Sequence, residues 1–465
     1  MLHFVEITLY VIISIALILK ATQRPIWGVG YYMLNFFAQP NYWKWGPPLT
    51  NPSILRWSLY SALLLMLVTL ATPSKTRFRS DRESSRSALF LILMVLNAFV
   101  VHLGFAYDAD ESWKVFVEMF KFSVLFFLVV ATIRTKHDFI LLLSFFTIGL
   151  GYWGFEARFV GLPPLVDGRL EGFGGPGCAN SNELASITAT LLPLIGGLLF
   201  LIRGFRRVLG VIAAGLALNI LMLCNSRGGF VGLFCGAITL PVLSTGKARR
   251  LAINGLVLGA VGFFLLAGNP QILKRFMTTF IEDKQARNTL DEDNKRTRKA
   301  FWAAALDLIS DSPFGNGGGC FKSGMGNPYI AKRGLATRNR SCHQGYLEEA
   351  MSWGVQGLLF RMGFIVCAGV AALKASRFRT KIGDPYVAFC GVCILAGFSV
   401  NLITSMFGDF LQMEWGYWLC ITAVAYAKVF GEKNYGLIPD AIVNAEESAS
   451  SASAAQPLAI PAGVS

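Results

Sequence analysis

The chain consists mostly of long apolar runs separated by short polar connections. A helix needs roughly 20 apolar residues to cross the hydrocarbon core of a bilayer, and most of these runs approach that length. The pattern predicts candidate spans at residues 3–19, 25–39, 54–71, 87–106, 113–133, 138–158, 183–202, 207–223, 228–245, 250–268, 350–372, 384–404 and 414–430. The run at 25–39 is short and contains Gly28 and Gly30, so we expect about 12–13 transmembrane helices.

Composition favours the same class of protein. Hydrophobic residues make up 54% of the chain and charged residues 15%, with a mean hydropathy of +0.51. A soluble domain carries about a quarter charged residues. The sequence therefore predicts an all-α polytopic membrane protein. The first span lacks a basic segment before it and an Ala-x-Ala-like cleavage site, so we expect it to be retained rather than removed as a signal peptide.

Basic residues gather in every second short connection, while the connections between them are neutral or acidic. Because Lys and Arg stay on the cytoplasmic side in short loops, the alternation predicts an outside N-terminus and a cytoplasmic C-terminus. It also explains much of the net charge of +14 without a nucleic-acid partner. The basic connections contain Lys20 and Arg24, Lys75 to Arg86, Arg134 and Lys136, Arg203 to Arg207, Lys247 to Arg250, and Lys374 to Lys381.

One connection is long, and it divides the chain. Its middle has helical spacing at Trp302, Ala305 and Ile309, and it ends in a glycine-rich loop after Pro313. Structured loops of this length are usually functional. The predicted regions are N-terminal transmembrane helices (1–268), a large, partly helical periplasmic loop (269–345), C-terminal transmembrane helices (346–431) and a disordered, Ala/Ser-rich cytoplasmic tail (432–465).

The nine cysteines show no metal-ligand spacing. Most lie in or beside apolar runs, where Cys packs as a small hydrophobe. Cys390 and Cys393 form a C-x-x-C inside a span, which favours helix packing over redox chemistry. Cys178, Cys320 and Cys342 fall outside the spans, where a disulfide between two of them is possible, but the sequence does not choose the pair.

Three polar features lie at the predicted outer membrane boundary: Arg227 in "NSRGGFVGL", the pair Arg296 and Arg298, and His343, one of four histidines. Each alone has an ordinary explanation. The first is a snorkelling arginine at a helix end, the second a solvated helix face, and the third a hydrogen-bonded interfacial histidine. Against this, a charge at membrane depth usually faces a cavity or a partner.

Taken together, these residues suit an anionic headgroup. Guanidinium groups match phosphate oxygens and keep their charge, and a neutral imidazole can accept a proton near neutral pH. The sequence shows no D-x-D and no carboxylate cluster for a metal ion. We therefore expect neither a metal nor another cofactor, and the charge on a leaving diphosphate would be offset by arginine alone.

Four stretches occur in a specific order around the long loop: "GRLEGFGGPGCANSNELA" (168–185), "NSRGGFVGL" (225–233), "RKAFWAAALDLISDSPFGNGGGCF" (298–321) and "HQGYLEEAMSWGVQGLLF" (343–360). In motif, order and spacing the chain resembles the O-antigen ligase and polymerase superfamily of bacterial envelope glycosyltransferases. The resemblance covers about 168–365. The N-terminal stretch "RPIWGVGYYMLNFFAQPNYWKWG" is similar to the O-glycosylation ligase subgroup.

The resemblance implies a GT-C-like fold and metal-independent, inverting transfer of a glycan from polyprenyl diphosphate at the periplasmic face of the bacterial inner membrane. It implies that Arg227 and Arg298 hold the diphosphate, with Arg298 preferred over Arg296 because it stands four residues before Trp302. His343 would orient or deprotonate the acceptor hydroxyl, or contact the diphosphate. Arg169 and Asn182 are further candidates in the donor region.

The chain departs from the family pattern at Gln344 (usually Asn), at Ser352 (commonly acidic) and at residues 181–183. These departures concern mainly the acceptor side. A lipid A-core sugar is the favoured acceptor, with another lipid-linked glycan (a polymerase) and protein Ser/Thr (O-glycosylation) as alternatives. A lipid-linked sugar transporter or flippase is the alternative of another class. It often shows repeats and acids on a pathway, whereas this chain has no detectable repeat and few such acids, Glu118 and Glu156 being the nearest cases.

Overall fold

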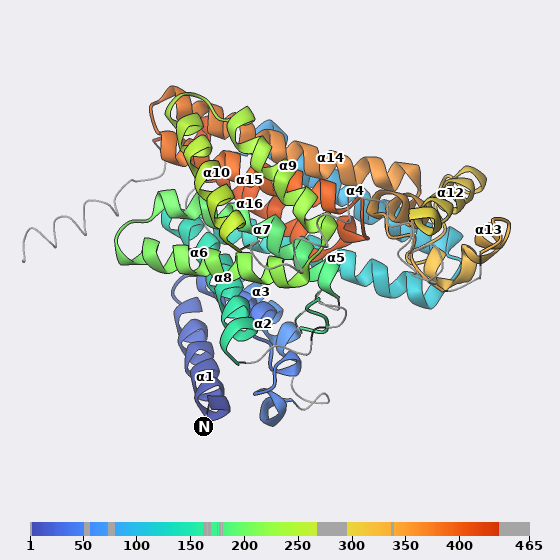
Figure 1. Ribbon diagram of the computed structural model, residues 1–465, viewed down its shortest axis with the longest axis horizontal. Coiled ribbons are helices and arrows are strands. Elements are labelled where there is room, and N and C mark those ends of the chain that lie inside the picture. Colours follow the sequence, from blue (N-terminus) through green and yellow to red (C-terminus); the bar gives the residue numbers. More distant parts are fainter. Residues whose placement is uncertain are drawn as a thin grey trace, which may run out of the picture.

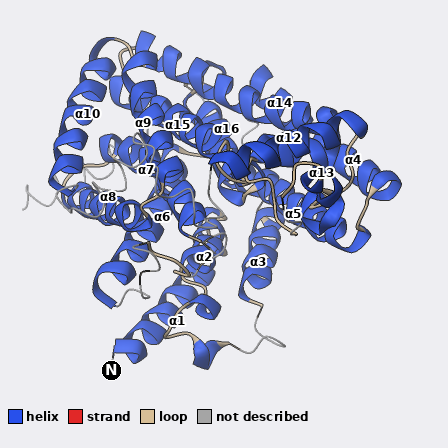
Figure 2. Ribbon diagram, turned by 45° about the vertical axis from the view of Figure 1, so that its right-hand side comes forward, coloured by secondary structure: helices blue, strands red, loops and turns tan. Residues whose placement is uncertain are grey.

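The computed structural model describes residues 2–50, 56–72, 80–160, 165, 169–173, 175, 178, 180–266, 295–335 and 339–436. These residues form helices and connecting turns, with no strand among them (Figure 2). The helices are α1 (Leu2–Ala21), α2 (Ile26–Phe37), α3 (Trp57–Ala71), α4 (Arg82–Phe105), α5 (Ala109–Thr132), α6 (Lys136–Phe155), α7 (Ser181–Leu201), α8 (Phe205–Cys224), α9 (Arg227–Leu243), α10 (Gly246–Leu266), α12 (Lys295–Asp311), α13 (Asn327–Ala331), α14 (Gly345–Lys381), α15 (Pro385–Thr404) and α16 (Glu414–Phe430). The all-α prediction is confirmed.

Every predicted span coincides with one of these helices. In the described part of the chain, eight helices are long and apolar enough to cross a membrane, and α3 and α9 are shorter apolar helices. The protein is therefore a polytopic membrane protein. Helix α2 has 12 residues, which gives a length of about 18 Å. Because the hydrocarbon core is about 30 Å thick, α2 is too short to cross it alone.

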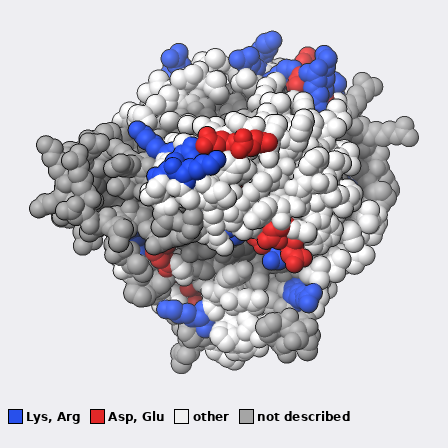
Figure 3. Space-filling view, turned by 90° about the vertical axis from the view of Figure 1, so that its right-hand side faces the viewer, with Lys and Arg blue, Asp and Glu red and all other residues white. Residues whose placement is uncertain are grey.

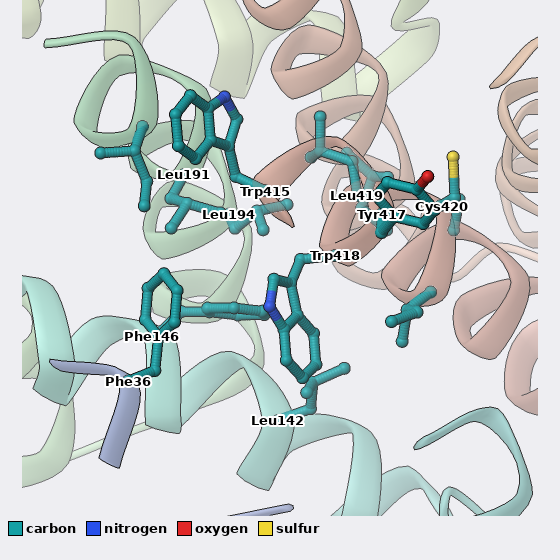
Figure 4. Packing of buried hydrophobic residues seen from close by; sticks show 14 of the residues in the cluster. Phe36, Leu142, Phe146, Leu191, Leu194, Trp415, Tyr417, Trp418, Leu419 and Cys420 are labelled. Atoms are coloured by element: carbon teal, nitrogen blue, oxygen red, sulfur yellow. The ribbon is translucent and has the colours of Figure 1, made fainter. Parts of the chain in front are cut away.

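The bundle is built around α15, with α7, α14 and α16 packed beside it. The apolar window of α15 is 83% buried, whereas that of α1 is 17% buried, so α15 is central and α1 presents its side chains outward. Figure 4 shows how the core closes around α16. Trp418 meets Phe146 of α6 edge to face at 5.5 Å, and Trp415 lies near Leu191 and Leu194 of α7.

One end of the bundle gathers basic connections that are far apart in sequence. Arg24 pairs with Asp138 at 2.6 Å, and Lys374 pairs with Glu83 at 2.8 Å. Other contacts join α10 to α15 and the segment after α16 to Ser80. We call this the basic end. The charge alternation therefore correctly placed these connections together.

Helices α12 and α13 lie at one end of the molecule, beside the tips of α4, α5 and α14 (Figure 1). Here α14 is broken at Gly354, where φ is 80° and ψ 169°. The carbonyls freed by the break are bonded: Met351 accepts from the Asn316 N–H at 3.0 Å, Ser352 from the Gly317 N–H at 3.0 Å, and Trp353 from the side chain of Asn97 at 2.8 Å. The glycine-rich loop thus fixes the first part of α14.

Candidate functional site

The turn between α8 and α9 presents Arg227. Asn225 adopts a left-handed conformation (φ 46°), and the Ser226 hydroxyl caps α9 by accepting from the Gly229 N–H. Arg227, the first residue of α9, is exposed. Short polar residues tolerate the left-handed region better than others, which explains why this tight turn can form without glycine.

Arg169 and Asn182 fix that turn from behind. A guanidinium nitrogen of Arg169 donates to Asn182 Oδ1 at 2.6 Å, and its Nε donates to the Cys224 carbonyl at 3.2 Å. Asn182 Oδ1 also accepts from the Ser226 hydroxyl at 2.9 Å. Arg169 and Asn182 were predicted to lie in the region that binds the glycan donor. Both are hydrogen-bonded to the α8–α9 turn, where they position Arg227.

His343 lies just before α14, also with a positive φ of 53°. Its Nδ1 is 3.3 Å from the Ser341 hydroxyl. Gln344 then caps α14 by accepting from the Leu347 N–H at 2.7 Å, so the replacement of Asn by Gln preserves a cap. Among the described residues, Asn225 and His343 are the two non-glycine residues with positive φ. Such backbone strain concentrates at functional sites.

Asp409 faces the His343 segment from the turn after α15. Burial raises the pKa of the Asp409 carboxyl, although hydrogen bonding to Ser341 and the neighbouring His343 act in the opposite direction. The sequence analysis missed Asp409 because two helices, α14 and α15, separate it from His343 along the chain. The available signal was an acid in the short "SMFGD" connection, on the predicted outer side.

A second carboxyl, that of Glu348, lies close to Asp409. One oxygen from each carboxyl and the sulfur of Cys342 lie within 4.8 Å of one another. Sequence analysis found no carboxylate cluster, and this expectation was wrong. The two acids come from different helical segments, so their approach depends on how α14 packs against the turn at 405–409.

That turn connects the two halves of the site. The Gly345 N–H donates to the Ser405 carbonyl at 2.8 Å, which holds the start of α14. On its other side Phe407 packs on Gly228, where an added Cβ would lie 3.1 Å from Phe407. Gly228, next to Arg227, and Gly345, two residues after His343, therefore both contact the turn at 405–409.

Arg298 lies in α12, which packs against the segment that ends at His343. Helix α12 buries Phe301, Ala305 and Leu308 in a small cluster with Cys342, the residue before His343. Because residues three and seven apart share a helix face, the half-buried Arg298 extends this face by one turn. The indole N–H of Trp302 is buried and donates to no described residue. The side chain of Arg296 lies outside the described part of the chain.

The cysteines form no disulfide. All nine are free thiols, and Cys320 and Cys342 are buried in the same hydrophobic cluster. Burial raises the pKa of the Cys342 thiol well above its usual value. The suggested bridge among Cys178, Cys320 and Cys342 is therefore absent, and these side chains serve as packing groups.

Part of the chain matches a known protein family. Residues 212–362 match the family described as O-antigen ligase. Over these residues the chain is similar to the O-antigen ligase family. The match confirms the resemblance inferred from the motifs, and it implies a lipid-linked glycan donor and a glycan acceptor. A comparison with curated proteins finds no match. Arg227, Arg298 and His343 lie inside the matched stretch, whereas Arg169, Asn182 and Asp409 lie outside it.

Proposed function

We propose that the protein transfers a glycan from polyprenyl diphosphate to an acceptor hydroxyl, with a lipid A-core sugar as the favoured acceptor. The reaction takes place at the periplasmic face of the bacterial inner membrane. The observation that carries this proposal is that the turn at 405–409 contacts both Gly228, next to Arg227, and Gly345, two residues after His343. A cationic group and a proton acceptor, both within the stretch that matches the O-antigen ligase family, are thereby fixed relative to each other.

The residues divide between the two halves of the reaction. Arg227 and Arg298 bind the diphosphate, because guanidinium groups present paired donors to phosphate oxygens and stay charged. His343 receives the proton of the acceptor hydroxyl, and the adjacent Asp409 carboxylate stabilises the resulting imidazolium. Arg169 and Asn182 act through the α8–α9 turn as positioning residues.

The bond changes follow from these roles. The acceptor oxygen attacks the anomeric carbon of the donor and forms the new glycosidic bond as its proton passes to His343. The bond between the anomeric carbon and the diphosphate oxygen breaks, and both its electrons leave with the diphosphate. The negative charge that develops there is offset by Arg227 and Arg298. Attack opposite the leaving group inverts the anomeric centre.

Transfer assays with purified variants test the proposal. His343→Ala should lower kcat by about 10²–10⁴-fold, the usual contribution of a general base, and Arg227→Ala and Arg298→Ala should lower kcat/KM strongly. The assay supplies a defined polyprenyl-diphosphate glycan with lipid A-core, lipid-linked glycan or peptide as separate acceptors. The acceptor used by the wild type then decides among ligase, polymerase and O-glycosylation activity.

Matched controls come from the same end of the molecule. His102→Ala removes a histidine that contacts Ser112 and Trp113, and Lys299→Ala removes the exposed cation next to Arg298. Both should keep near wild-type transfer. Wild-type transfer in His343→Ala would refute the assigned role. Movement of donor across vesicles without transfer to any acceptor would favour a transporter.

A further inference from the structure

Glu348, the second carboxyl beside Asp409, has no role in the reaction as described so far. Glu348 is buried in the first turn of α14, and the Cys342 thiol lies 3.7 Å from its Oε2, in position to donate to it. The three acidic groups of Glu348, Asp409 and Cys342 meet within 4.8 Å. Asp409 Oδ1 is buried and has no hydrogen-bond partner among the described residues.

Ionising both carboxyls in this buried site is unfavourable in free energy. Like charges a few ångströms apart in buried surroundings repel strongly, so one carboxyl of such a pair keeps its proton. The charged groups facing the pair are His343 and Lys322. Lys322 is 58% exposed and already pairs with Glu111 at 3.3 Å, so solvent and Glu111 weaken its effect on the two carboxyls.

A proton retained by the pair would also give Asp409 Oδ1 a hydrogen-bond donor. At a separation of 4.8 Å or less, a protonated carboxyl can donate to Asp409 after a small side-chain rotation or through one bridging water. The Ser341 side chain and the Gln344 backbone stabilise the charged form of Asp409. Glu348 accepts from the Cys342 backbone and from its thiol, a weak donor, whereas Asp409 has a hydroxyl donor and the neighbouring His343. Glu348 is therefore the better holder of the proton.

We propose that Glu348 and Asp409 hold one proton between them at neutral pH and present a single negative charge to His343. This inference rests on the function proposed above and makes Glu348 a positioning residue. One negative charge stabilises the imidazolium formed during transfer. A second would favour the imidazolium before the reaction and leave less neutral ring to accept the hydroxyl proton.

The pH dependence of kcat/KM tests the charge of the pair. Glu348→Gln copies the neutral carboxyl, so it should keep transfer within about threefold of wild type and leave the acid limb of the profile at the same pH. Asp409→Asn removes the charge facing His343, so the ring loses a proton more easily and the acid limb moves to lower pH. Glu348→Ala removes the carboxyl that shares a proton with Asp409, so Asp409 is less firmly positioned and kcat should fall about tenfold. An acid limb that moves to lower pH in Glu348→Gln, as in Asp409→Asn, would overturn the proposal.

An infrared measurement gives a readout besides activity. At neutral pH the wild type should show the carbonyl stretch of a buried protonated carboxyl, Glu348→Gln should lack it, and the external-loop control Asp307→Asn should keep it. Absence of this band in folded wild-type protein overturns the shared proton, whatever the transfer assay shows. So would stoichiometric zinc that is lost in Glu348→Gln, because the three side chains would then be metal ligands. Conversely, the band together with wild-type transfer in His343→Ala would refute the catalytic role of His343 and leave the proton assignment standing.

Discussion

The two ends of the bundle differ in whether residues other than glycine adopt a positive φ. At the basic end, the left-handed positions that begin or follow helices are glycines: Gly204, Gly246 and Gly383. At the site end glycines such as Gly317 do the same, but Asn225 and His343 also adopt a positive φ, although each carries a side chain. The left-handed region costs an ordinary L-residue roughly 1–2 kcal/mol. The site end therefore accepts strain at two residues that lie beside or within the candidate site.

Charges differ between the ends in the same way. At the basic end, Lys374 is 62% exposed where it pairs with Glu83, and Arg24 is 42% exposed where it pairs with Asp138. Beside the break in α14, Glu349 and Arg361 pair at 2.7 Å with exposures of 0% and 2%. Viewed from the end that carries α12 and α13 (Figure 3), charged side chains form a few patches on a largely uncharged face.

The contrast separates charges that orient the chain from charges that shape a site. Exposed cations at the basic end act through their number and side of the membrane, so no single partner is essential. Buried groups near His343 act through fixed geometry, and each needs its partner because an unpaired buried charge is costly. Substitutions of the same kind should therefore have unequal effects at the two ends.

The largest effect on stability is expected at the Glu349–Arg361 pair. Glu349 also accepts from Gln412 at 2.9 Å, and Arg361 contacts Tyr417 at 3.2 Å. Glu349→Ala leaves the guanidinium buried without its carboxylate, which should lower the free energy of unfolding by about 3–5 kcal/mol. Thermal and denaturant unfolding in detergent micelles measure the change.

A paired replacement separates lost charge balance from lost packing. The double variant Glu349→Leu with Arg361→Met should recover most of the lost stability, because similar volume is kept and no charge remains buried alone. If the single and double variants are equally unstable, the ion pair itself is required. If Glu349→Ala is as stable as wild type, even the most buried ion pair does not need its partner, and the difference between the two ends is contradicted.

A glycine comparison tests the backbone at each end. In Gly317→Ala, an added Cβ would lie 2.9 Å from the backbone of Ala106 and 2.8 Å from the Ser112 hydroxyl, at a φ of 85°. Overpacking and strain together should cost about 2–4 kcal/mol. At Gly383, with φ 83° and open space around it, the same change should cost about 1 kcal/mol. Unfolding midpoints measure both, and equal losses would contradict the prediction.

The sequence predicted the parts of this molecule that depend on local pattern. Apolar runs located every helix of the bundle, and the alternation of Lys and Arg grouped the basic connections. Ser226 caps α9 just before the span predicted at 228–245, whereas α14 begins at Gly345, five residues before its predicted span. These features need only neighbours in sequence, because helical periodicity and caps are local properties.

The remaining features depend on contacts between distant segments. Asp409 and Glu348 look like ordinary acids at a helix end or in a short connection, and only the packing of the turn at 405–409 brings them together. Gly354 lies inside an apolar run, so the break in α14 was hidden within one predicted span. Likewise, the sequence did not show that Arg169 and Asn182, two candidate donor-binding residues, are bonded to each other beside the turn that presents Arg227.

The smallest effect is expected from the exposed ion pair of the basic end. Lys374→Ala removes the 2.8 Å contact with Glu83, but the lysine is mostly in water, where such pairs contribute about 0–1 kcal/mol. We expect a small loss of stability that shrinks further at high salt, with unchanged glycan transfer, measured by unfolding and assay on one preparation. A large loss of transfer would mean that the basic end communicates with the site through α14, because Lys374 and His343 are joined along that helix. The two ends would then be coupled through α14 rather than independent.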